Sequence, residues 1–229
     1  MTRIFITGDT HGDYDWNKLN TTYFTEQKQL TKDDYVIIAG DFGGVWGMDR
    51  TDKYIIKTYE NRNFTTLFVD GNHENHDALD RYPVEEWHGG KIHRISDTVI
   101  HLMRGQVYEI DGRTFFTMGG AQSTDKMCRK EGVSWWAREI PSDEEFDEAI
   151  RNLEKHDFKV NYIVTHCAPE NYAFYMQMEY SRKFNRLTEF LSSLITEYNV
   201  DFDGWYFGHY HEDTNFDKFH CLYQRVIEI

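Results

Sequence analysis

Five short segments of the chain carry aspartate, asparagine or histidine directly after a stretch that has the composition of a β-strand. They are Gly8-Asp9-Thr10-His11-Gly12, Gly40-Asp41, Gly71-Asn72-His73-Glu74, Thr165-His166 and Gly208-His209-Tyr210-His211. Polar side chains from segments so far apart can meet only if the strand ends that carry them lie together, and we expect one sheet to hold all five ends. This requirement restricts the fold more than any other feature of the sequence.

The polar side chains of these segments have the chemistry of transition-metal ligands. Carboxylates, imidazoles and a neutral amide oxygen together suit Mn, Fe, Zn or Ni better than Ca or a structural Zn that is held by thiolates. Residues two apart on an extended strand end point the same way, so Asp9 and His11 are predicted to chelate one ion together. Seven candidate ligands are too many for one tetrahedral ion and predict two divalent ions. The candidates are Asp9, His11, Asp41, Asn72, His166, His209 and His211.

Length and charge limit the class of protein further. With 229 residues the chain can bury one sizeable core, and we expect a single domain over residues 1–229. The formal net charge of −14 at pH 7 repels nucleic-acid backbones and anionic membranes at long range. A nucleic-acid partner is therefore disfavoured, although a local basic groove would still allow one.

Cysteine content and apolar run lengths indicate a cytoplasmic protein without a membrane partner. The three cysteines and the absence of a Cys-x-x-Cys motif do not indicate a disulfide framework. The first strand-like stretch leads directly into Asp9, which leaves no room for a removable signal peptide. The longest apolar runs, such as residues 35–39, are too short to span a bilayer.

Apolar runs predict an α/β fold. Runs that read as strands, separated by segments long enough to return as helices, cover residues 4–7, 35–39, 66–69, 162–165 and 205–207. Further strands at closer spacing are predicted over residues 100–103, 106–110, 114–117 and 221–229. Asp111-Gly112 lies between two of these and is typical of a tight hairpin turn, so a second or mixed sheet is implied.

Two helices and one long loop are also readable. Ser142 and Glu145 have the spacing of a capping box, with Phe146, Ile150 and Leu153 on one stripe of the helix that follows. The second helix is predicted from apolar residues at helical spacing, which are Phe184, Leu187, Leu191, Leu194 and Tyr198. The polar segment 121–139 is longer than a usual connection, which fits a functional lid and a plain surface excursion equally well.

In this order, the five segments resemble the motif blocks of the calcineurin-like metallophosphoesterase superfamily, from Asp9 to His211. The resemblance implies an α/β fold, a four-layer α/β/β/α sandwich of two mixed sheets, with a dinuclear metal site at the strand ends. It also implies that the chain hydrolyses a phosphomonoester or a phosphodiester by attack of a hydroxide that the metal ions activate.

The resemblance further implies roles for individual residues. One ion would be held by Asp9, His11, Asp41 and His211. The other would be held by Asp41, Asn72, His166 and His209. His73 would be the catalytic residue that stabilises the transition state or protonates the leaving oxygen.

The second block departs from one branch of that superfamily. In the protein serine/threonine phosphatases, an Asp that orients the catalytic His and an Arg that holds phosphate occupy the positions of Gly44 and Val45. Their absence argues against a phosphoprotein phosphatase and leaves open what orients His73. Arg104 or Arg129 could hold phosphate instead.

We therefore expect a metal-dependent phosphoric ester hydrolase that acts on a small phosphate ester or a nucleotide-like substrate. Trp46 could stack on a nucleobase, although packing in the core or in a lid is an equally simple role. The alternatives within the enzymes are a nuclease and a dinucleoside-polyphosphate hydrolase. An alternative of another class is a non-catalytic metal-binding scaffold of the same fold. Nothing in the sequence indicates the oligomeric state.

Overall fold

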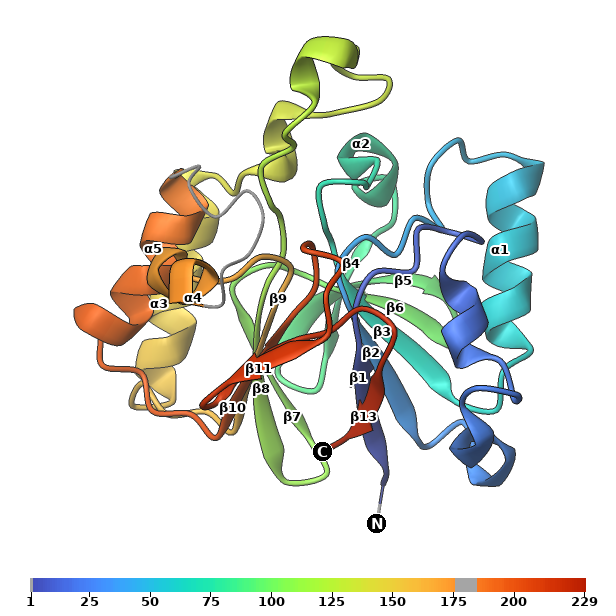
Figure 1. Ribbon diagram of the computed structural model, residues 1–229, viewed down its shortest axis with the longest axis horizontal. Coiled ribbons are helices and arrows are strands. Elements are labelled where there is room, and N and C mark those ends of the chain that lie inside the picture. Colours follow the sequence, from blue (N-terminus) through green and yellow to red (C-terminus); the bar gives the residue numbers. More distant parts are fainter. Residues whose placement is uncertain (1, 176–184) are drawn as a thin grey trace.

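Two mixed β-sheets pack face to face, and helices cover both outer faces (Figure 1). The computed structural model describes residues 2–175 and 185–229. No helix in these two ranges is long and apolar enough to cross a bilayer. The predicted four-layer α/β/β/α arrangement is confirmed.

The first sheet has seven strands among the described residues. They are β1 (Ile4–Thr7), β2 (Tyr35–Ala39), β3 (Thr65–Val69), β4 (Val84–Trp87), β5 (Gly90–Ser96), β6 (Val99–Leu102) and β13 (Val226–Glu228). Their order is β13-β1-β2-β3-β6-β5-β4. The pairs β1–β2, β2–β3 and β3–β6 are parallel, and the outer pairs are antiparallel.

The second sheet has six strands in the described part of the chain. They are β7 (Gln106–Ile110), β8 (Arg113–Met118), β9 (Tyr162–Thr165), β10 (Gly204–Phe207), β11 (Thr214–Phe216) and β12 (Phe219–Cys221). Their order is β11-β12-β10-β9-β8-β7, with β8, β9, β10 and β12 mutually parallel. Asp111 and Gly112 connect β7 to β8 with φ of +51° and +73°, as a tight hairpin turn requires.

The expectation that a single sheet holds all five strand ends is wrong. Strands β1, β2 and β3 belong to the first sheet, whereas β9 and β10 belong to the second. Strands that are buried on both faces have the same apolar composition in either sheet, so composition does not tell the two sheets apart. The five polar segments meet because the carboxyl ends of both sets of strands lie at one edge of the sandwich (Figure 1).

Three apolar layers hold the sandwich together. Phe5 belongs to an outer layer with Ile55, whereas its neighbour Ile6 lies between the sheets in one cluster with Phe115. The next residue of β8, Phe116, faces the other outer layer. Each strand therefore buries both its faces, which explains the near-continuous apolar runs of the sequence.

Helices form the outer layers. They are α1 (Arg50–Glu60), α2 (His76–Leu79), α3 (Asp143–Lys155), α4 (Glu170–Tyr175) and α5 (Arg186–Thr196). Short 3₁₀ helices span Trp16–Leu19, Thr25–Gln29, Lys126–Cys128 and Ala137–Glu139. Helix α1 covers the seven-stranded sheet, and α3 and α5 cover the six-stranded sheet (Figure 1).

The two predicted helices are present, with differences at their ends. The capping box between Ser142 and Glu145 begins α3, as predicted. Helix α5 buries Leu187, Leu191 and Leu194, but it ends before Tyr198. Phe184 lies outside the described residues.

The observed strands differ from the predicted ones in two ways. Strands β4, β5 and β11 were not predicted, because they are largely polar and lie at or near sheet edges, where one face needs no apolar residues. The strand predicted over residues 221–229 is two strands, since a turn separates the end of β12 from β13.

Candidate metal centre

Asp41 is the hub of the polar cluster at this edge. It follows β2 and is almost fully buried. Its Oδ2 lies 3.3 Å from His11 Nε2, and its Oδ1 lies 3.3 Å from His166 Nε2. Oδ1 also accepts a hydrogen bond of 2.7 Å from the backbone N–H of His73. One carboxylate thus faces imidazoles from both sheets, which is the geometry of a ligand that bridges two cations.

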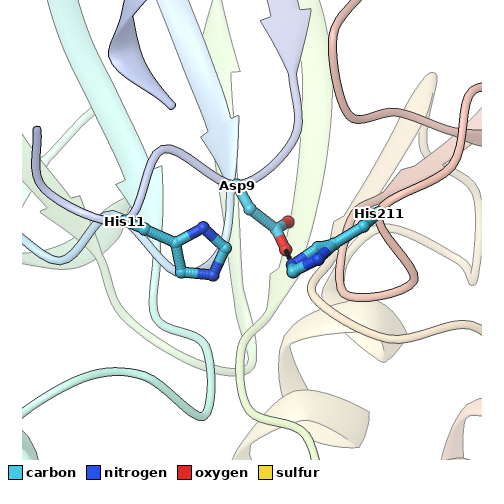
Figure 2. A group of neighbouring side chains, drawn as sticks. All are labelled: Asp9, His11 and His211. Carbon is cyan, nitrogen blue, oxygen red and sulfur yellow. Dashed lines mark ion pairs between the residues drawn. The ribbon is translucent and has the colours of Figure 1, made fainter. Parts of the chain in front are cut away.

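Asp9 is the second buried carboxylate and lies between two imidazoles at the end of β1 (Figure 2). Its Oδ2 is 3.1 Å from His211 Nε2, and its Oδ1 accepts a 2.9 Å hydrogen bond from the backbone N–H of His209. Oδ2 is buried and accepts no hydrogen bond of regular geometry from the described residues. A buried carboxylate oxygen in this state is available to a metal ion.

His166 connects Asp41 to Asn72. Its Nδ1 is 2.9 Å from the carbonyl oxygen of Ala39, and its Nε2 is 3.2 Å from Asn72 Oδ1. The backbone oxygen accepts the Nδ1 proton, so Nε2 is the nitrogen that faces the centre and could bind a metal once it is deprotonated. The ring of His209 lies edge-on to that of His166, with centroids 5.0 Å apart.

Three overlapping groups of described residues could hold a metal ion, with ligand atoms that all lie within 4.8 Å of one another. They are Asp9 with His11 and His211, His11 with Asp41 and His73, and Asp9 with Asp41 and His166. Asn72 and His209 join these groups through His166. The structure therefore brings together all seven residues that the sequence indicates as ligands, and it adds the ring of His73 to one group.

The local backbone differs from the extended strand ends that were expected. His11, Asp41, His209 and His211 have φ between +44° and +68°, the left-handed region that side chains other than glycine rarely adopt. Alternation along a strand therefore does not aim these residues, and the prediction that Asp9 and His11 share a face for that reason is wrong. Left-handed residues held this way are concentrated at functional sites.

Glycine allows the two carboxylates to approach the neighbouring loops. A Cβ on Gly71 would collide with Asp41, and a Cβ on Gly208 would collide with Asp9. The glycines of the third and fifth segments are therefore required by packing against the carboxylates of the first two.

The charges of the centre favour a cation. Burial alone would lower the pKa of His166, but the carboxylates of Asp41 and Asp9 outweigh it and raise that pKa to about 10. For His11 the same opposition raises the pKa to about 9. His209 differs, because burial and the charge of His166 lower its pKa to about 4. The two carboxylates thus create a negative field that protons partly neutralise and that divalent ions would neutralise better.

The donor set fits the ions that the family implies. Two carboxylates, imidazole nitrogens and one amide oxygen suit first-row transition metals, and the open Oδ2 of Asp9 lies among them. None of the three cysteines lies in these groups, so a thiolate-held structural Zn is not indicated.

Two residues that the sequence patterns did not indicate, Asp15 and Tyr223, contact the proposed histidine ligands. Asp15 Oδ2 lies 2.7 Å from His11 Nδ1, and the hydroxyl of Tyr223 donates to Asp15 Oδ1 over 3.0 Å. The ring of Tyr223 also stacks on His211, with centroids 4.7 Å apart. The only sequence signal for this arrangement is that Asp15 lies four residues after His11, a spacing common for aspartates with no role.

A cavity of about 540 Å³ opens beside the ligands. Its walls are His11, Tyr14, Asp15, Gly43, Trp46, His73 and His211. Trp46 therefore lies in a position to contact a substrate, and its indole packs edge-on against Trp136 at 5.3 Å. Among the described residues that line this cavity, Asp15 is the one carboxylate, and none is a lysine or an arginine.

The two arginines that were considered for phosphate binding have different positions. Arg129 lies over His73, with Nη1 3.3 Å from Nδ1 and Nη2 3.1 Å from Nε2. Arg104 is buried and donates to Asp70 Oδ2 from Nε over 2.9 Å. Arg104 therefore lies behind the third segment and not in the cavity, contrary to the expectation that it could hold phosphate.

A two-sheet sandwich with buried carboxylates and imidazoles at one edge is the architecture expected of a metallophosphoesterase. The family model described as Calcineurin-like phosphoesterase matches residues 2–213, and the chain belongs to this family. The predicted resemblance is thereby confirmed. No curated protein matches the chain.

Two solved structures are similar in fold. One is described as "GAP50 the anchor in the inner membrane complex of Plasmodium", with a TM-score of 0.53 and 15% identity over 97% of this chain and 71% of that chain. The other is a protein of unknown function, AQ665 from Aquifex aeolicus, with a TM-score of 0.42 and 13% identity over 100% of this chain and 96% of that chain. The first likeness concerns the fold alone, and the second supports no argument.

Proposed function

We propose that this protein hydrolyses phosphate esters with the help of two divalent metal ions. The observation that carries the proposal is the meeting of two buried carboxylates with imidazoles from both sheets, with a cavity beside them. Membership of the calcineurin-like phosphoesterase family supports the same chemistry.

The proposed ligands divide into two sets that share Asp41. The first set is Asp9, His11, Asp41 and His211, in which Asp9, His11 and His211 have ligand atoms within 4.8 Å of one another and His11 Nε2 lies 3.3 Å from Asp41 Oδ2. The second set is Asp41, Asn72, His166 and His209. When bound, the two ions supply a hydroxide nucleophile at neutral pH and neutralise phosphoryl charge. We propose Mn, Fe, Zn or Ni as these ions, since the donor set suits all four.

His73 is the proposed catalytic residue. Its backbone N–H is fixed on Asp41, and its ring lines the cavity. An imidazole in that place can donate a hydrogen bond or a proton to the leaving oxygen. Because His73 also belongs to one of the groups that could hold a metal, its role must be separated from ligation by experiment.

The cavity supports a small substrate. Its walls are mainly aromatic rings, including Tyr14 and Trp46, and its one charged side chain besides the histidines is that of Asp15. A flat and uncharged leaving group, such as a nucleoside or an aryl alcohol, suits this lining better than a polyanion. We therefore favour a phosphomonoester or phosphodiester of this kind over a nucleic acid or a dinucleoside polyphosphate. We also propose a cytoplasmic location, which three free cysteines support.

The alternative of another class is a non-catalytic scaffold. It is favoured by the description of one solved structure of similar fold as an anchor. In this chain, the complete ligand set and the position of His73 argue for catalysis instead.

The first experiment compares metals and substrates. Metal-free protein is reconstituted with Mn, Fe, Ni, Zn or Mg and assayed on monoester and diester model substrates, nucleotides and short nucleic acids. We expect turnover of small esters with at least one first-row metal and little cleavage of nucleic acid. A protein that binds two ions and turns over none of these substrates would support the scaffold.

The second experiment tests His73 with the variant His73→Ala. We expect both metal ions to remain bound, while kcat on esters with poor leaving groups falls by about 10²- to 10⁴-fold, the usual contribution of general acid catalysis. His156→Ala, at the end of α3, is the matched control and should have no effect. Loss of a metal ion in His73→Ala would show that His73 is a ligand.

A further inference from the structure

Two consecutive residues of the third segment receive side-chain contacts from the segment 121–139. We propose that this segment is a fixed arm of the active site, in which Ser123 orients the amide of Asn72 and Arg129 binds the phosphoryl group beside His73. This inference rests on the proposed function, and it gives a role to Arg129, the side chain that lies against His73. The arm, lime-green in Figure 1, projects from the sheets beside α2.

The contact with Asn72 occupies the nitrogen end of its amide and leaves the oxygen end facing the centre. Asn72 Nδ2 donates a hydrogen bond of 3.2 Å to Ser123 Oγ, and both side chains are buried. The amide oxygen then points to His166 Nε2, 3.2 Å away. A rotated amide would present its N–H groups to a cation, which would repel it. Ser123 thus stabilises the orientation in which Asn72 is a ligand.

The contact with His73 places a fork of N–H donors at the leaving-group side of the site. Two nitrogens of the Arg129 guanidinium lie 3.1 and 3.3 Å from the two ring nitrogens of His73. A phosphoryl oxygen that reaches His73 therefore also comes within reach of the guanidinium. Arginine binds phosphate oxygens in a bidentate manner that lysine cannot reproduce.

The arm itself holds Arg129 in place. Arg129 Nε donates to Asp125 Oδ2 over 2.8 Å, and Nη1 donates to the carbonyl oxygen of Ser134 over 3.3 Å. Both partners belong to the same arm. The N–H groups that face His73 are the ones that a ligand beside that ring would meet, so the side chain is oriented before substrate arrives.

The second segment provides no such cation. Gly44 and Val45 stand where another branch of the family carries an aspartate and an arginine, and Val45 is buried. A side chain on Gly44 would collide with the ring of Phe42. The arm carries four basic residues against three acidic ones, in a chain whose formal net charge is −14. It is therefore a locally basic element beside an acidic centre.

Both ends of the arm are linked to Asp70, the residue that precedes the third segment. Gly120 N donates to the backbone oxygen of Asp70 at 2.9 Å, one residue before Gly71. At the other end, Arg104 Nη2 donates to the carbonyl oxygen of Arg138 at 2.8 Å, while Arg104 Nε binds the side chain of Asp70. These bonds keep the arm in register with Asn72 and His73.

Two further contacts fix the middle of the arm. Glu139 is fully buried, accepts a 3.0 Å hydrogen bond from the backbone of Ser123 and pairs with Lys126. Trp136 Nε1 donates to Asp77 Oδ2 in α2 over 2.8 Å. An arm held in this way is part of the site and needs no closing motion to reach it.

Substitutions on the arm test each contact without changing a metal ligand. Arg129→Ala is expected to lower kcat/KM by about 10²- to 10³-fold, as for loss of one fixed donor to transition-state charge, with both metals retained. The same variant should bind inorganic phosphate at least about tenfold more weakly when loaded with metal. Arg129→Lys should restore part of the phosphate binding but little of kcat, because the fork is lost.

Ser123→Ala tests the second contact through metal affinity, which does not depend on turnover. We expect one of the two ions to bind about 10- to 100-fold more weakly, as is usual when a residue that supports a ligand is removed. Lys130→Ala, an exposed basic residue of the same arm, is the control for all three variants and should behave as wild type.

The outcomes separate this inference from the proposed function. Wild-type phosphate affinity in both Arg129 variants would overturn the role of Arg129, and unchanged binding of both ions in Ser123→Ala would overturn that of Ser123. A wild-type protein that hydrolyses no ester would overturn the proposed function, while phosphate and metal affinities would still decide the role of the arm. If Arg129→Ala does not fold, Arg129→Lys decides the point by its phosphate affinity.

Discussion

Two buried clusters of histidine and aspartate lie at neighbouring strand ends, and in the described part of the chain only one of them contains groups that could hold a metal. The first is the metal centre around Asp41 and Asp9. The second surrounds Asp70, the residue between β3 and the third segment, and we call it the Asp70 cluster. Its members are Asp70, His76, His93, His101 and Arg104, all buried.

The Asp70 cluster satisfies its carboxylate from within the protein. Asp70 Oδ2 accepts hydrogen bonds from Arg104 Nε at 2.9 Å and Nη2 at 2.5 Å, and Oδ1 lies 3.3 Å from His101 Nε2. His93 Nδ1 in turn lies 3.1 Å from His101 Nδ1. Among the residues that the structure describes, the groups that could hold a metal all belong to the other cluster.

His76 and His93 of the Asp70 cluster have lowered pKa values, whereas His166 and His11 of the candidate metal centre have raised ones. In the Asp70 cluster, burial and the positive charge of Arg104 lower the pKa of His76 to about 3. Burial and the neighbouring His101 lower the pKa of His93 to about 4. In the metal centre, carboxylates raise the pKa of His166 to about 10. The positive charge of Arg104 thus opposes protonation of His76, whereas the carboxylates beside His166 favour its protonation.

The largest expected effect comes from removing the shared carboxylate of the metal centre. Asp41→Asn should lose at least one metal ion, and kcat/KM should fall by about a thousandfold, since a metal contributes several kcal/mol to the transition state. Metal content and steady-state kinetics measure this, with the exposed Asp33→Asn as control. A variant that keeps two ions and full activity would contradict the assignment of Asp41.

Removing the fixed cation should make the Asp70 cluster resemble the metal centre. Arg104→Met leaves a buried carboxylate unpaired, so the free energy of unfolding should fall by about 3–5 kcal/mol. The pKa of His76 should rise, because the positive charge of Arg104 that opposes its protonation is gone. Denaturant unfolding and histidine NMR titration measure the two effects.

The double variant Asp70→Asn with Arg104→Met is the control for that prediction. It removes both charges and should recover most of the lost stability, because no unpaired buried charge is left. Equal instability of the single and double variants would show that packing, and not charge, holds the Asp70 cluster.

A smaller effect is expected from changing Asp15, which contacts the proposed ligand His11. Asp15→Asn weakens the hydrogen bond that orients His11 and should weaken one metal site by about 10- to 100-fold. The exposed Asp13→Asn, two residues away, is the matched control. Calorimetric metal titration distinguishes them, and equal effects of both variants would point to net charge alone.

The smallest expected effect is the release of protons when a metal ion binds to the candidate centre. The Asp70 cluster should show no such release. Without metal, the pKa values of His166 and His11 are about 10 and about 9, and a protonated imidazole cannot bind a metal. Below pH 9 metal binding must therefore release protons, so metal affinity should rise with pH until about pH 10. Titration heats in two buffers of different ionisation enthalpy measure the release, and heats independent of the buffer would refute it.

The same linkage predicts the stability of the metal-free protein. The raised pKa values of His166 and His11 mean that their contribution is fully present below their ordinary pKa of 6.5. It should be lost as pH rises through about 9 and 10. The Asp41→Asn variant should lose most of this pH dependence.

Much of the fold and most of the candidate site followed from local patterns. Strands such as β2 and β9 were predicted because double-sided burial demands unbroken apolar runs. The seven ligand candidates were identifiable because glycine, carboxylate and imidazole recur after five such runs. Edge strands such as β4 were not predicted, because their side chains are largely polar.

Local sequence patterns could not predict the contacts between distant segments. Asp15 and Ser123 look like ordinary polar residues until His11 and Asn72 are placed beside them. Arg104 and Arg129 are equivalent in sequence terms, but one pairs with Asp70 and the other lies on His73. Partner choice of this kind depends on positions in space.

The sequence by itself determined which side chains are available at the strand ends, because hydrophobic periodicity and glycine placement are local properties of the chain. Only the tertiary structure decided that two sheets share the site, that Arg129 and not Arg104 meets His73, and which aspartate has an oxygen available to a metal. Charges and hydrogen bonds act over a few ångströms, so their outcome is fixed only when the strands have packed.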